Sequence, residues 1–157
     1  MPLQLDEGGS KLRRDFTPDE LLATIRKHNL PRCLERTAIG DVPEPLRYWC
    51  EPVSPNHVWP LQPDFIPVWT TNGTECLAYE PSLRKYTSQH IEDVAVGQSR
   101  KFDSFRDVSI WVLLDLVGGE SDDEIREAAA FLGFDQVEEL LGCMSVEEFY
   151  AKHSVDP

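Results

Sequence analysis

Two runs of β-forming residues, 65–70 and 74–80, flank the pair Asn72-Gly73 and limit what this chain can fold into. Asn-Gly is the preferred pair in a hairpin turn where both residues need a positive φ. A second turn at 80–83 leads into another strand-like run at 84–91. The sequence therefore predicts a three-stranded antiparallel meander.

A small sheet with an apolar face needs a covering layer, and residues 104–117 are apolar at helical spacing. The helix is apolar almost all round, so we expect it to be central, with Gly118-Gly119 ending it. Asp115 is the exception within it. Either it pairs with a base such as Arg84 or Arg100, or it lies near the helix end and reaches water.

Capping signals predict four more helices. Thr17 and Glu20 begin the first, which ends near Asn29 because Pro31 restricts the residue before it. Short helices then begin at three further capping boxes: Ser121 with Glu124, Asp135 with Glu138, and Ser145 with Glu148. The predicted class is α+β, an antiparallel β-meander packed against helices with a helical C-terminal third.

Seven prolines between positions 43 and 67 exclude long helices and central strands there. The aromatic residues of this region, Tyr48, Trp49 and Trp59, favour an ordered connector or edge segment over a free linker. We expect residues 1–15 to be a flexible tail and residues 16–157 to form a single domain.

Charge limits the partners. The chain has 28 acidic and 15 basic side chains, a net charge of −13, which makes nucleic acid and anionic membranes poor partners. Residues 103–157 hold 14 of the acids and only three bases. This part is either a solvated face or a surface that attracts a basic protein. The candidate contacts are Trp59, Trp69, Glu120, Asp122, Asp123, Glu124, Glu127, Glu138 and Glu139.

No pattern typical of catalysis or of a bound group is present. The chain has no phosphate-binding loop, its four histidines lie in separate segments, and adjacent acids such as Asp122-Asp123 point apart on a helix. We expect no catalytic residue, no metal and no cofactor. The alternatives are a regulatory or scaffold protein of the same fold, and an enzyme with an unrecognised thiol or carboxylate site, for example Cys76 beside His90.

The four widely spaced cysteines favour free thiols in a reducing compartment, with one disulfide or a scattered metal site as alternatives. The first residues do not resemble a secretory signal, and the apolar run 108–117 is about half the length of a membrane span. We therefore expect a cytoplasmic protein.

Four short motifs resemble the SUKH superfamily: Phe65-Ile66-Pro67-Val68-Trp69, Thr71-Asn72-Gly73, Ala78-Tyr79-Glu80-Pro81 and Phe102-Asp103-Ser104-Phe105. The resemblance covers roughly residues 60 to 117. Glu80 replaces the family's usual Asp, and of its early motifs only Leu30-Pro31 is matched. The resemblance implies a non-catalytic recognition domain. In bacteria such domains serve chiefly as immunity proteins that neutralise toxins, and in fungi as regulators of cell-wall synthesis.

Overall fold

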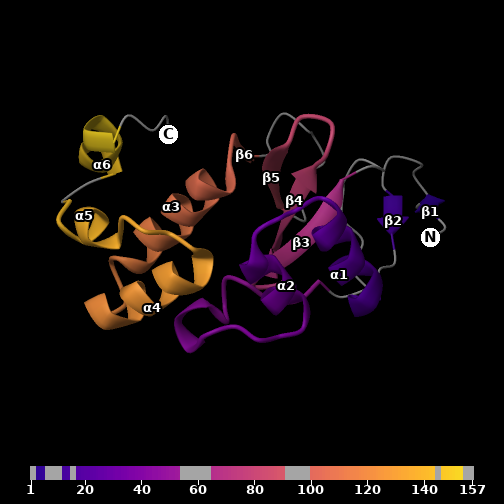
Figure 1. The fold of residues 1–157 in the computed structure, drawn as a ribbon, viewed down its shortest axis with the longest axis horizontal. Helices are drawn as coiled ribbons and strands as arrows, with labels where there is room; N and C mark the ends of the chain where they lie inside the picture. The colour runs from indigo at the N-terminus through magenta and orange to yellow at the C-terminus, as the bar shows by residue number, and fades with distance from the viewer. Residues whose placement is uncertain are drawn as a thin grey trace.

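The computed structural model describes residues 3–5, 12–14, 17–53, 65–90, 100–143 and 146–153. Its main sheet has four antiparallel strands in the order β3-β4-β5-β6 (Figure 1). Their bounds are Ile66–Thr71, Glu75–Glu80, Lys85–His90 and Arg100–Phe102. The predicted meander is confirmed as β3 to β5. Strand β6 was not predicted, since its three residues include the exposed Arg100 and Lys101 and show little β pattern.

The turn between β3 and β4 has the predicted geometry. Asn72 and Gly73 have φ values of 51° and 66°, and the Thr74 amide donates to the Thr71 carbonyl at 3.0 Å. Positive φ at both central residues suits the right-handed twist of the two strands. The hairpin register is therefore set locally, by the residue pair that predicted it.

The proline-rich region borders the sheet edge, as expected of an edge segment. Glu51 and Thr70 exchange two backbone hydrogen bonds of 2.9 Å along the outer side of β3. Pro67 is tolerated within β3 because β3 is the edge strand of the named sheet. A 3-10 turn, η1 (Glu44–Leu46), precedes this bridge. Positions 54–64, which include Trp59, lie outside the described residues.

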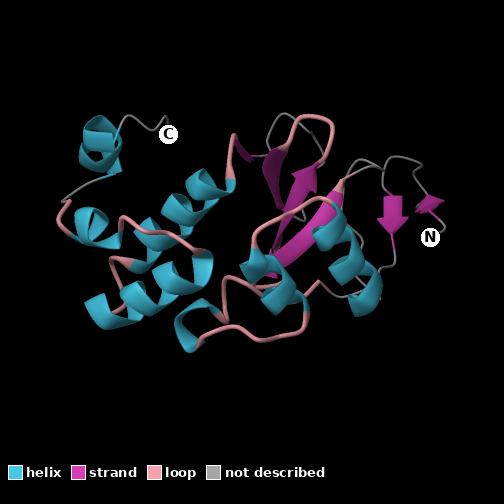
Figure 2. Ribbon diagram, in the orientation of Figure 1, coloured by secondary structure: helices cyan, strands magenta, loops and turns pink. Residues whose placement is uncertain are grey.

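Helices precede and follow the main sheet in the described chain, and the α+β class is confirmed (Figure 2). They are α1 (Pro18–Lys27), α2 (Arg32–Ala38), α3 (Phe105–Leu116), α4 (Asp122–Leu132), α5 (Val137–Leu141) and α6 (Val146–His153). The C-terminal third is helical, as predicted. Helix α2 was not predicted. Pro31 was interpreted only as the residue that ends the preceding helix, whereas it is also the N-cap of α2.

Helix starts were predicted well where a side chain caps them. Thr17 and Ser121 accept hydrogen bonds from the amides of Glu20 and Glu124, as the capping boxes require. The box expected at Asp135 is wrong, because α5 begins after Gln136 and no side chain caps it. Ser145 lies outside the described residues.

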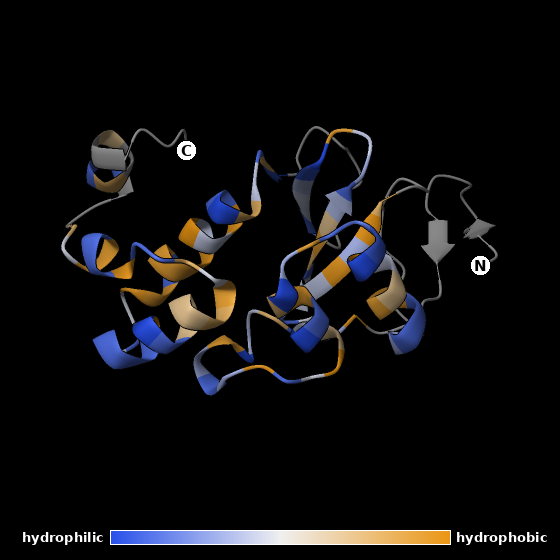
Figure 3. Ribbon diagram, in the orientation of Figure 1, coloured by the Kyte–Doolittle hydropathy of each residue, from blue (hydrophilic) through white to orange (hydrophobic). Residues whose placement is uncertain are grey.

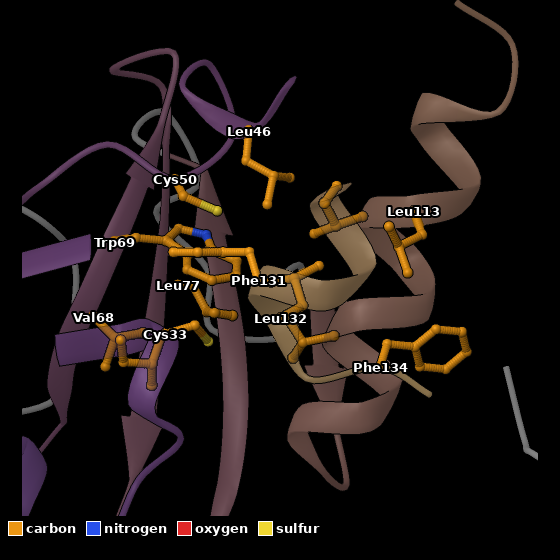
Figure 4. Close-up of a cluster of buried hydrophobic side chains, with 14 of the residues drawn as sticks. Cys33, Leu46, Cys50, Val68, Trp69, Leu77, Leu113, Phe131, Leu132 and Phe134 are labelled. Carbon is orange, nitrogen blue, oxygen red and sulfur yellow. The ribbon is translucent and has the colours of Figure 1, made fainter. Parts of the chain in front are cut away.

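One face of the sheet forms the main core. Paired residues on this face are Ile66, Tyr79, Tyr86 and Phe102 in one row, and Trp69 and Leu77 in the next. Helix α3 packs here, with the ring of Phe105 6.0 Å from that of Trp69 and 5.6 Å from that of Tyr86. Figure 4 shows Val68, Trp69 and Leu77 of the sheet gathered with Cys33 of α2 and with Phe131 and Leu132 of α4.

Most of the described buried apolar residues belong to one core cluster, which runs from Leu21 to Phe149. In the segment predicted to be a loose tail, strands β1 (Leu3–Leu5) and β2 (Leu12–Arg14) pair antiparallel. Asp115 is exposed near the end of α3, which confirms the second of its two interpretations.

Candidate partner-binding surface

The seven acidic residues predicted as partner contacts lie on α4, on α5 and in the loop before α4. We call this set the acidic surface: Glu120, Asp122, Asp123, Glu124, Glu127, Glu138 and Glu139. Five of the seven are exposed, and Glu120 and Glu124 are half-buried. Residues 118–143 contain eight carboxylates and the single base Arg126, a net charge of −7. Figure 3 shows the hydrophilic start of α4 and the hydrophilic residues of α5.

The pattern of α4 explains why these acids face water. Ile125, Ala128, Ala129 and Leu132 recur at helical spacing and are almost completely buried. The first turn begins at the capping box of Ser121 and Glu124, where carboxylates complement the helix dipole. Burial of the apolar stripe therefore directs the charged residues outward.

Arg126 joins the two helices of the acidic surface. Its guanidinium contacts Asp123 on α4 at 2.9 Å and Glu138 on α5 at 2.7 Å. The hydrogen bonds from Arg126 hold the pKa of Glu138 below its ordinary value. Arg126 was not among the residues predicted for this surface, although its spacing of three residues from Asp123 is a recognisable signal. Two of the seven acids are therefore partly neutralised within the chain.

Glu120 and Glu124 form a second local arrangement. The pKa of Glu120 is raised, chiefly by its hydrogen bond with Glu124 and then by repulsion between the two carboxylates. The pKa of Glu124 is lowered, chiefly because the Ser121 hydroxyl donates to it, 2.9 Å from Oε1. Of the predicted acids, Asp122, Glu127 and Glu139 are thus exposed and have no ion pair among the described residues.

The two tryptophans predicted as contacts do not join this surface. Trp69 is only 1% exposed and packs in the core beside Phe105, so its assignment as a contact is corrected. It was misjudged because β3, although at the edge of the named sheet, is buried on both faces. Trp59 lies outside the described residues. In the described part of the proline-rich region, the aromatic side chain of Tyr48 is 61% exposed.

The described cysteines are free thiols, and three of them are buried. Burial raises the pKa of Cys33 to about 12 and also raises the pKa values of Cys50 and Cys76. Cys76 is paired with Gln89, whereas His90 is paired with Glu75, so Cys76 and His90 point to opposite faces of the sheet. The geometry gives no support to a Cys76–His90 nucleophile.

No group of three His, Cys, Asp or Glu side chains suited to a metal occurs in the ranges that the structure describes. Within the same ranges, no helix combines the length and apolar character that a bilayer crossing demands.

Comparison of the chain with models of protein families, with curated proteins and with solved structures finds no match. The resemblance to the SUKH superfamily therefore stays a prediction from the sequence motifs.

Proposed function

We propose that this protein is a non-catalytic binding module whose acidic surface meets a basic protein. The observation that supports this most directly is the exposure of Asp122, Glu127 and Glu139 on two adjacent helices, in a segment of net charge −7. A concentration of one sign of charge speeds the encounter with a partner of the opposite sign and disfavours partners of the same sign.

The finer proposal is a toxin-neutralising immunity protein, with a basic nuclease-type toxin as the partner. It rests on the SUKH resemblance, whose motif residues lie in a strand, in a turn and at the start of a helix of this fold. Ile66-Pro67 lies in β3, Asn72-Gly73 forms the turn, and Ser104-Phe105 begins α3. A nuclease that binds phosphate backbones needs a basic surface, which the acidic surface would complement.

The experiment measures binding to basic proteins encoded beside this chain, by calorimetry at about 50 mM and about 300 mM salt, where screening differs strongly. We expect one such protein to bind, and to bind at least tenfold more weakly at the higher salt. No binding, or binding that is independent of salt, would contradict recognition through charge.

Two matched double variants test whether the basic partner binds at the acidic surface. Glu127→Gln with Glu139→Gln removes two charges from the acidic surface and breaks no ion pair of the described residues. Asp19→Asn with Glu80→Gln removes two charges from α1 and from the end of β4 and, like the first pair, breaks no ion pair of the described residues. Only the first pair should slow association. Equal effects of both pairs would show that the total charge, and not the acidic surface, governs binding.

A further inference from the structure

A pocket of about 760 Å³ lies between α2, the start of α3 and the end of α4. Its apolar lining includes Phe105, Phe131, Leu132 and Phe134, of which Figure 4 shows the last three together with Cys33 of α2. Its polar lining includes three arginines, Arg32, Arg36 and Arg106. The volume is in the range typical of sites for small organic ligands.

Two of the three guanidiniums are held in place by aromatic rings. Arg36 lies over the ring of Phe131 at 4.8 Å, and its Nε donates to Asp41 at 2.8 Å. Arg106 lies over the ring of Phe134 at 5.5 Å and donates to the side chain of Gln136. Stacking and hydrogen bonding fix these cations before any ligand arrives, which lowers the entropy lost on binding.

Arg32 differs from the other two. It is exposed, it lies one helical turn before Arg36 on the same face of α2, and it makes no ion pair or hydrogen bond within the described part of the chain. The fold therefore brings to this pocket one guanidinium whose removal breaks no hydrogen bond or ion pair of the described residues.

The charge of the lining is opposite to that of the whole protein. Three arginines face two carboxylates, Asp41 and Asp135, in a chain whose net charge is −13. Positive groups near the end of α4 also complement its helix dipole. Complementing the dipole of α4 does not by itself require a cavity, nor an arginine that, like Arg32, makes no ion pair with the described residues.

We propose that this pocket binds a small organic anion, a carboxylate or phosphate carried on an apolar body. The anionic group would bind Arg32 and Arg36 through two parallel N–H···O bonds, the geometry for which guanidinium is suited. The apolar body would contact Phe131 and Phe134. The neutral, buried thiol of Cys33 adds no charge that would repel it.

The test uses phenyl phosphate as the probe and inorganic phosphate as the probe without an apolar body. Binding to the full chain is measured by titration calorimetry at low salt, together with the shift in melting temperature. We expect phenyl phosphate to bind more tightly than inorganic phosphate and to raise the melting temperature. A dissociation constant above about 10 mM for phenyl phosphate, or equal affinity for both probes, would overturn the proposal.

Variants at Arg32 distinguish binding in this pocket from general electrostatic attraction between the anion and the protein. Arg32→Gln should bind phenyl phosphate about tenfold more weakly or worse, because a charged hydrogen bond is lost, while its unfolding is unchanged. Arg32→Lys should recover part of the affinity. The control is Arg84→Gln, which removes the same charge from an exposed arginine outside the lining and, like Arg32→Gln, breaks no ion pair of the described residues. Equal weakening in Arg32→Gln and Arg84→Gln would also overturn the proposal.

Discussion

The two ends of α4 meet opposite kinds of surface. Its first turn, Asp122 to Glu124, belongs to the acidic surface, where Arg126 is the single base in a segment of net charge −7. Its last turn, Ala130 to Leu132, lines the pocket with the three arginines. In Figure 1 the helix runs from the outer end of the molecule toward α2. Both arrangements complement the helix dipole.

The two surfaces depend on the fold in different ways. The acids in the first turn of α4, Asp122 to Glu124, are adjacent in sequence, so they stay close together in any conformation in which α4 forms. The arginines come from α2 and α3, and reach α4 only because Phe131, Leu132 and Phe134 pack into the common core. Loss of tertiary packing should therefore remove the pocket while the local acidic character of α4 remains.

The largest effect is expected at the pocket end of α4. Phe131 is 8% exposed, belongs to the core and lies beneath Arg36. Phe131→Ala should lower the free energy of unfolding by about 3–5 kcal/mol, because it removes a buried ring and leaves a cavity. Urea denaturation measures this, and phenyl phosphate binding should be lost as well.

The control for that variant is Phe131→Leu, which keeps an apolar side chain but removes the ring. It should lose less stability than Phe131→Ala and still weaken phenyl phosphate binding, because Arg36 loses its stacking partner. If Phe131→Ala unfolds at the same urea concentration as the wild type, the pocket is not supported by the core.

A smaller effect is expected at the acidic end. Ser121→Ala removes the hydroxyl that caps α4 and should cost about 1 kcal/mol, within a range of roughly 0.5–2 kcal/mol. The matched control is Ser82→Ala in the exposed turn between β4 and β5, which should change stability by less than about 0.5 kcal/mol. Equal losses in the two variants would mean that the cap does not stabilise α4.

The two ends of α4 also differ in how far the sequence predicted them. The seven acids were named from the sequence, because helix caps and charge patterns act over a few neighbouring positions, and their contact with a partner stays a prediction. The pocket was not predicted, because residues 31–41, 105–109 and 130–135 contain no motif that links them. Only the packing of α2, α3 and α4 reveals that their arginines converge.

The same distinction holds in the sheet. The hairpin around Asn72-Gly73 was predicted because its turn geometry is a property of those two residues. The burial of Trp69 was not, since it depends on α3 placing Phe105 over the sheet and on the bridge of Glu51 with Thr70. Strand β6 was missed for a related reason, since only pairing with β5 makes its three residues a strand.

The smallest effect concerns Arg126, the one cation of the acidic surface. Its bridges are exposed and screened by water, so Arg126→Gln should change the free energy of unfolding at neutral pH very little. The variant should have a clearer effect on Glu138, whose pKa should rise toward the ordinary value of 4.5, as measured by NMR titration.

The sign of the pH dependence of stability follows from this pKa shift. A carboxyl whose pKa is depressed in the folded protein adds stability above its unfolded pKa and loses it as pH falls through the folded pKa. Arg126→Gln should therefore be less sensitive to acid between pH 4.5 and the folded pKa of Glu138. Glu138→Gln should remove the same sensitivity, and the double variant should add little, since both residues belong to one bridge. A titration of Glu138 that is unchanged in Arg126→Gln would show that the bridge does not persist in solution, and the acidic surface would then be more strongly negative than its two bridged acids suggest.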